Sequence, residues 1–102
     1  MIEITKKVVE RAMLVALDTK TYSKEVVEEH LAELEELANT AGAETIFKII
    51  QSKARMDSAY YIGKGKAEEL AQLIELNDIN IIIFHDDLTP VQVRNLSDFF
   101  KR

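Results

Sequence analysis

A short glycine and lysine segment is the first part of this sequence that is suited to chemistry. Gly63–Lys66 precedes a stretch with helical spacing of apolar residues, and the backbone N–H groups at a helix start can hold a phosphate. The segment departs from the nucleotide-binding pattern G-x-x-x-x-G-K-[ST], because no glycine stands five residues before Gly65 and Ala67 follows Lys66. Glu68 takes the place of the third glycine in the pattern G-x-G-x-x-G. Ordinary turn glycines explain the segment at least as well.

Basic residues surround the same segment. Four cations bracket two neighbouring tyrosines, Tyr60 and Tyr61, and these cations are Lys53, Arg55, Lys64 and Lys66. Cations mixed with aromatic rings suit contact with phosphates and stacking on bases. The alternative is that the tyrosines pack against the sheet and the lysines are only solvated. The candidate contact residues for RNA or phosphate are Lys53, Arg55, Tyr61, Gly63, Lys64, Gly65 and Lys66.

Carboxylates and histidines are weaker candidates for metal binding or catalysis. Asp18, Asp86 and Asp87 follow apolar runs and are of the type that binds Mg²⁺. Asp86 and Asp87 also precede a predicted helix, where carboxylates favour the exposed amides, and we take this as their default role. His30 lies on the apolar side of the first predicted helix, where we expect a packed histidine and not a ligand. No serine stands near His85 in a nucleophile elbow, and the chain has no cysteine. We therefore expect no catalytic residue, no metal site and no cofactor in this chain.

Length and charge restrict the class of protein. The chain has 102 residues, 47% of them hydrophobic and 30% charged, which is typical of one globular domain. Its net charge of −5 argues against a nonspecific nucleic-acid binder, but the charges are separated. Residues 23–44 carry seven glutamates and one lysine, whereas residues 46–67 carry five basic residues and one aspartate. No apolar run is long enough for a membrane span and no signal-peptide pattern begins the chain, so we expect a cytoplasmic domain.

The spacing of apolar residues predicts the strands and helices that position these candidate residues. Apolar runs predict strands at residues 12–17, 46–50 and 79–84, with a brief extended segment at 60–62. Helical spacing predicts helices at residues 24–41, from 66 to about 76, and from 90 onward. The predicted caps are Ser23, Gly42, and the Thr89–Gln92 capping box. This order predicts an α/β fold: a small parallel sheet of three to four strands flanked by helices on both faces.

The predicted sheet has an open edge. No strand pattern follows the third helix, and natural proteins normally cover such an unpaired edge. We expect Leu96, Phe99 and Phe100 to be partly exposed there. Self-association, or residues 1–10 acting as an arm or an extra strand, would then cover the edge.

One passage resembles a known family. Tyr61–Leu70 reads YIGKGKAEEL and is similar to the YIGxGKxEEL signature of the N-terminal domain of HflX-type GTPases. Three further passages resemble, in the same order and spacing, the family's first strand, its LEELAxTAGAE passage and its FDDELSPxQxRNLE passage; they are Arg11–Val15, Leu34–Glu44 and Phe84–Leu96. The residues that depart from the usual pattern are His85, Val93 and Ser97. The resemblance covers about residues 11–97.

The resemblance implies that residues 1–102 are the N-terminal α/β domain of a ribosome-associated GTPase that helps to split stalled ribosomes. Its partners would be the large ribosomal subunit with its rRNA, and its own GTPase domain. GTP and Mg²⁺ would bind in that GTPase domain, which we expect, with a helical hairpin, outside this chain. The chain would then not be an enzyme, and Gly63–Lys66 would be the one candidate for the ATP binding proposed for this region in some members. The alternative is a free-standing small-molecule or phosphate-binding α/β module that uses Gly63–Lys66 with Asp18 and Asp86.

Overall fold

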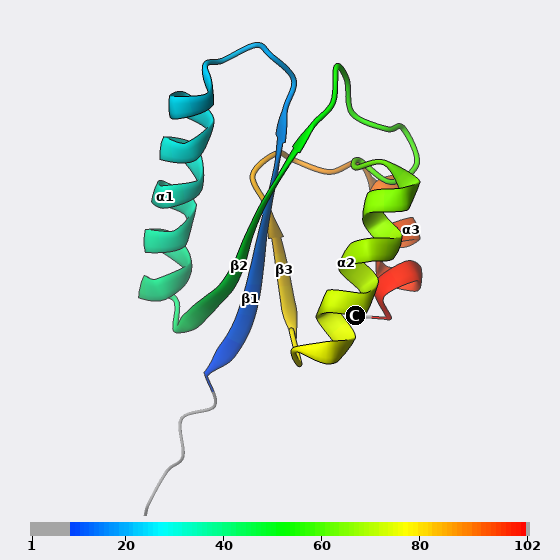
Figure 1. The fold of residues 1–102 in the computed structure, drawn as a ribbon. Coiled ribbons are helices and arrows are strands. Elements are labelled where there is room, and N and C mark those ends of the chain that lie inside the picture. The colour runs from blue at the N-terminus through cyan, green and yellow to red at the C-terminus, as the bar shows by residue number, and fades with distance from the viewer. Residues whose placement is uncertain (1–8, 102) are drawn as a thin grey trace, which may run out of the picture.

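The computed structural model describes residues 9–101, in which three strands and three helices alternate. They are β1 (Glu10–Asp18), α1 (Lys24–Thr40), β2 (Ala43–Ser52), α2 (Lys64–Leu76), β3 (Ile81–Phe84) and α3 (Pro90–Phe100). The strands form one parallel sheet in the order β2-β1-β3. α1 covers one face of this sheet, and α2 and α3 lie on the other (Figure 1). The predicted α/β fold is confirmed.

The central strand, β1, explains the two-sided architecture. Residues 12–17 are all apolar and all buried, because a strand covered on both faces needs apolar side chains on both. Alternate side chains point to opposite faces. The set that packs with α2 and α3 is Met13, Val15 and Leu17. The set that packs with α1 is Ala12, Leu14 and Ala16. The core is therefore divided into two layers by the sheet.

α1 begins as its sequence predicts and ends within one residue of the prediction. The hydroxyl of Ser23 accepts a hydrogen bond from the N–H of Val26 at 3.3 Å, which satisfies an amide that the helix leaves unpaired. After the helix, Gly42 has a φ of +92°, a left-handed conformation that glycine adopts without strain. The buried residues of the helix are Val27, Leu31 and Ala38. Most of its glutamates lie on the exposed side.

Several element boundaries differ from the predicted ones, and β1 itself extends beyond residues 12–17 at both ends. β2 is longer than residues 46–50, because it pairs with β1 along the whole of that strand. β3 starts two residues later than predicted: the N–H of Ile79 bonds to the carbonyl of Ile74 in α2 at 3.0 Å, so the chain is still leaving the helix there. α2 starts at Lys64, two residues earlier than predicted. The helix therefore includes most of the glycine and lysine segment.

α3 packs into the core layer that lies between the sheet and α2. Leu96 and Phe100 are 3% and 7% exposed and pack in the core beside α2, so the expectation that they are partly exposed is wrong. Phe99 is half-buried. Of the expected arm at residues 1–10, residues 1–8 lie outside the described part of the chain, and Glu10 already belongs to β1. Within residues 9–101 no helix is both long and apolar enough to cross a membrane.

Candidate functional site

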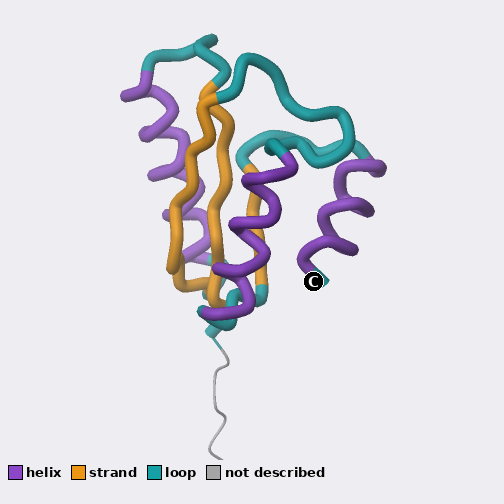
Figure 2. Tube along the Cα trace, turned by 45° about the vertical axis from the view of Figure 1, so that its right-hand side comes forward, coloured by secondary structure: helices purple, strands orange, loops and turns teal. Residues whose placement is uncertain are grey.

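The loops that follow the three strands lie at one end of the molecule. Because all strands run in parallel, residues 19–23, 53–63 and 85–89 meet at the carboxyl edge of the sheet, as Figures 1 and 2 show. This edge is where open α/β sheets place their ligands. All the predicted contact residues lie in the loop at 53–63 or in the first turn of α2.

The loop at 53–63 is folded around one aspartate. Asp57 Oδ1 accepts hydrogen bonds from the N–H groups of Ala59 and Tyr60 at 2.7 and 2.8 Å, a turn that the short aspartate side chain favours. The backbone groups of Asp57 and Tyr61 exchange two further bonds, each 2.9 Å long. The backbone of this basic loop is therefore ordered by its own hydrogen bonds.

Two amide side chains of α3 attach the loop to the body of the domain. Gln92 is 1% exposed, and its Nε2 donates to the carbonyl of Asp57 at 2.7 Å. Asn95 Nδ2 donates to the carbonyl of Ala59 at 3.0 Å. Sequence reasoning found Gln92 as part of the Thr89 capping box, which is confirmed, but it gave no role to Asn95. A polar residue at position 95, one turn from Gln92, was the available signal.

Tyr61 is a core residue and not a surface contact. Its side chain is fully buried, its hydroxyl donates to Asp86 Oδ2, and its ring meets Phe84 edge-on at 5.5 Å. Burial, together with the hydrogen bond to Asp86, raises the pKa of the Tyr61 hydroxyl above its ordinary value. Its φ of +67° also corrects the predicted extended conformation of residues 60–62. Because its ring is buried, Tyr61 cannot stack on a base in this structure, and its predicted role as a contact residue is wrong.

Gly63 is also engaged within the protein. Its N–H donates to Gln51 Oε1 at 2.9 Å, so this amide is not free for an anion. A Cβ at Gly63 would lie 3.2 Å from Gln51 Nε2, which explains why a glycine fits here. Gln51 lies near the end of β2, and sequence reasoning gave it no role.

The first turn of α2 presents Lys64, Gly65 and Lys66. Its N-cap is Gly63, and no side chain caps the helix, so the turn keeps N–H groups without an intrahelical partner. A Cβ at Gly65 would meet no heavy atom within 4 Å, and its φ is not positive. Neither packing nor backbone conformation therefore requires glycine at position 65.

The predicted cations differ in how they are paired. Lys66 Nζ lies 3.3 Å from Glu69 Oε2, one turn along α2. Lys53, Arg55 and Lys64 form no ion pair within the described residues, and the last two are exposed. These three cations, which we call the free cations, are the part of the predicted site that is available to a ligand.

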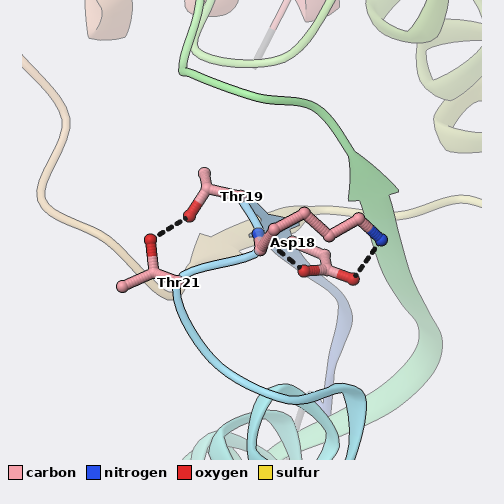
Figure 3. A network of polar contacts seen from close by, with 4 residues as sticks. Asp18, Thr19 and Thr21 are labelled. Carbon is pink, nitrogen blue, oxygen red and sulfur yellow. Dashed lines mark hydrogen bonds and ion pairs between the residues drawn. The ribbon is translucent and has the colours of Figure 1, made fainter.

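Two of the three candidate aspartates, Asp18 and Asp86, are engaged within the protein. Asp18 Oδ1 accepts from the N–H of Lys20 at 3.0 Å, and its Oδ2 lies 3.4 Å from Lys20 Nζ (Figure 3). The N–H of Lys20 is the main cause that lowers the pKa of the Asp18 carboxyl. Asp86 accepts from Tyr61 and lies 3.5 Å from His85 Nδ1. Among the described residues, no three acidic, histidine or cysteine side chains gather as metal ligands.

The fold and the site define a small parallel α/β domain with an ordered basic loop at its carboxyl edge. Residues 28–102 match the family model described as GTP-binding GTPase N-terminal. The chain is 47% identical over 89 residues to the GTPase HflX of Caldanaerobacter subterraneus subsp. tengcongensis, covering 87% of this chain and 20% of that protein. It is 38% identical over 94 residues to the GTPase HflX of Alkalihalophilus pseudofirmus, covering 92% of this chain and 22% of that protein. The chain belongs to the HflX family.

These matches cover most of this chain but only a small part of each relative. It spans about a fifth of the length of the curated relatives it matches. The GTPase HflX of Escherichia coli shows a similar relation, with 35% identity over 68 residues that cover 67% of this chain and 16% of that protein. The resemblance found from the glycine and lysine signature is thereby confirmed at the level of the family.

Proposed function

We propose that this domain binds the large ribosomal subunit through ribosomal RNA, in the cytoplasm, as the N-terminal part of a GTPase that splits or rescues ribosomes. The observation that carries the proposal is the presence of the three free cations, Lys53, Arg55 and Lys64, on one ordered loop and helix start. Cations without an internal partner contribute to phosphate binding by releasing counterions from the nucleic acid. Membership of the HflX family supports the same proposal.

The start of α2 supports contact with a phosphate group in particular. The helix has no side-chain cap, and its first-turn N–H groups and dipole favour an anion. Lys64 and Gly65 are exposed at this point. A backbone phosphate of RNA can therefore be held by N–H groups and by cations at the same place.

In this proposal the domain positions the protein and performs no catalysis. The relatives are named GTPases, and we assign GTP and Mg²⁺ to a part of the protein other than residues 1–102. The buried Tyr61 donates its hydroxyl hydrogen bond to Asp86 at the carboxyl edge, so this polar pair is engaged within the protein.

Charge reversal of the free cations tests the proposal. The Lys53→Glu, Arg55→Glu, Lys64→Glu variant of this chain should lose co-sedimentation with purified large subunits at low salt. The control reverses three cations elsewhere, Lys48→Glu, Arg94→Glu and Lys101→Glu, with the same change in net charge, and should bind better than the loop variant. Equal binding by the two variants would contradict the proposal.

A nucleotide-binding measurement distinguishes the proposed function from the alternative, a free-standing small-molecule or phosphate-binding module. Titration of the chain with GTP or ATP in the presence of Mg²⁺ should give no saturable heat, because the N–H of Gly63 is occupied by Gln51 and the segment lacks the full phosphate-loop pattern. A micromolar dissociation constant that Lys64→Glu weakens would favour a small-molecule phosphate site at Gly63–Lys66 instead.

A further inference from the structure

Three aromatic rings from three different segments of the fold meet at the carboxyl edge. The rings of His30 and His85 are stacked, with centroids 4.7 Å apart and planes 8° from parallel. Tyr22 meets His30 edge-on, with centroids 5.4 Å apart. Tyr22 comes from the loop after β1, His30 from α1, and His85 from the loop after β3. We call these three residues the ring cluster.

The ring cluster is held in place from inside the protein. His85 Nδ1 lies 3.5 Å from Asp86 Oδ1, and the other oxygen of Asp86 accepts the hydroxyl of the buried Tyr61. The orientation of His85 is thus linked to the core. Rings that are ordered before a ligand arrives lose little conformational entropy when it binds.

The ring cluster is nevertheless open to solvent. Tyr22 is 58% exposed, and the His85 side chain is 33% exposed. An exposed tyrosine at the edge of a fixed pair of rings offers a flat apolar surface with no partner in the core clusters of the domain.

The charges around the ring cluster indicate the class of ligand. Lys20, which is paired with Asp18, precedes Tyr22 in the loop after β1, and Lys24 follows it as the first residue of α1. The free cations lie on the loop at 53–63 and at the start of α2, and Figure 1 shows these segments at the same end of the molecule. Lys24 forms no ion pair within residues 9–101. Aromatic faces set among cations are the arrangement with which proteins bind single-stranded nucleic acid, because bases stack on the rings while phosphates meet the cations.

We propose that the ring cluster stacks on unpaired bases of RNA, with Tyr22 and His85 supplying the contact faces and His30 supporting them from behind. This inference rests on the proposed function, since it assumes that the carboxyl edge faces RNA. It adds that the bound RNA is single-stranded at this point. The free cations hold the backbone, and the ring cluster holds bases.

Two matched probes separate the contributions of bases and phosphates. One is a fluorescent single-stranded oligouridylate, and the other is a ribose-phosphate strand of the same length without bases. The wild-type chain should bind the oligouridylate more tightly. Tyr22→Ala with His85→Ala should weaken that binding by about fivefold or more, while binding of the abasic strand and the dependence on salt stay unchanged.

Further variants distinguish stacking from charge and from loss of fold. His85→Phe keeps a flat ring without a titratable group and should retain the preference for bases. Leu37→Ala, at another exposed apolar residue on α1, should bind both probes as the wild type does. Thermal unfolding of each variant shows whether the fold is kept.

Different experimental results would contradict this inference and the proposed function. Equal, salt-dependent binding of both probes by the wild type would overturn stacking and leave the proposed function in place. Failure of the free-cation reversal to weaken either probe would count against the proposed function itself. A wild-type chain that binds neither probe at low salt would contradict both.

Discussion

At the scale of single residues, neighbouring positions of the glycine and lysine signature have different roles in the structure. Tyr61 and Gly63 belong to the glycine and lysine signature, yet both are committed inside the protein, Tyr61 to Asp86 and Gly63 to Gln51. These partners lie 25 and 12 residues away in the sequence, so no local pattern predicts them. Lys64 and Gly65, in contrast, were predicted to be accessible and are exposed.

Gly65 allows a prediction in which stability and binding change in opposite directions. Gly65→Ala should stabilise the chain by about 0.5–1 kcal/mol, because alanine favours a helix and its Cβ meets no atom within 4 Å. The same Cβ should weaken binding to large subunits, since it would separate an approaching phosphate from the N–H groups of α2. Denaturant unfolding and co-sedimentation measure the two effects.

The matched control for this prediction is Gly42→Ala. Gly42 has a φ of +92°, so alanine there should destabilise the chain by about 1 kcal/mol and leave subunit binding unchanged in the folded protein. Unweakened binding by Gly65→Ala would show that no ligand approaches the backbone at that point.

At the scale of elements, those with strong local patterns were predicted well. β1 and α1 follow directly from a continuous apolar run and from amphipathic spacing with caps. The ends of β2 and β3 were less accurate, because pairing with β1 sets them. The attachment of the loop at 53–63 to α3 was not predicted, since it depends on Gln92 and Asn95 reaching residues more than 30 positions away.

Gln92 joins two elements, so its removal should affect both. Gln92→Ala should lower the free energy of unfolding by about 2 kcal/mol, because it leaves the carbonyl of Asp57 and the N–H of Thr89 without their partner. Trypsin should also cleave the released loop faster after Arg55. Gln72→Ala, at an exposed position on α2, should stay within about 0.5 kcal/mol of the wild type. A similarly small effect for Gln92→Ala would contradict the role given to it.

At the scale of the whole molecule, charge is separated between surfaces. α1 presents most of its glutamates to solvent on one face of the sheet, while the free cations lie at the carboxyl edge. Under the proposed function, this separation favours approach to RNA through the edge and disfavours approach through α1, despite the net charge of −5. Self-association through the open side of β3 stays a prediction. Leu96 and Phe100 are buried, so they do not contribute to the exposed apolar patch on which that prediction partly relied.

Site-specific crosslinking from the two ends of α2 tests the central claim most directly. A photoreactive phenylalanine analogue is placed at position 64, at the carboxyl edge, or at position 76, where Leu76 is 80% exposed at the other end of the same helix. After irradiation with large ribosomal subunits, position 64 should crosslink to ribosomal RNA and position 76 should not. Crosslinks from position 76 alone, or from position 64 to no RNA, would contradict the account.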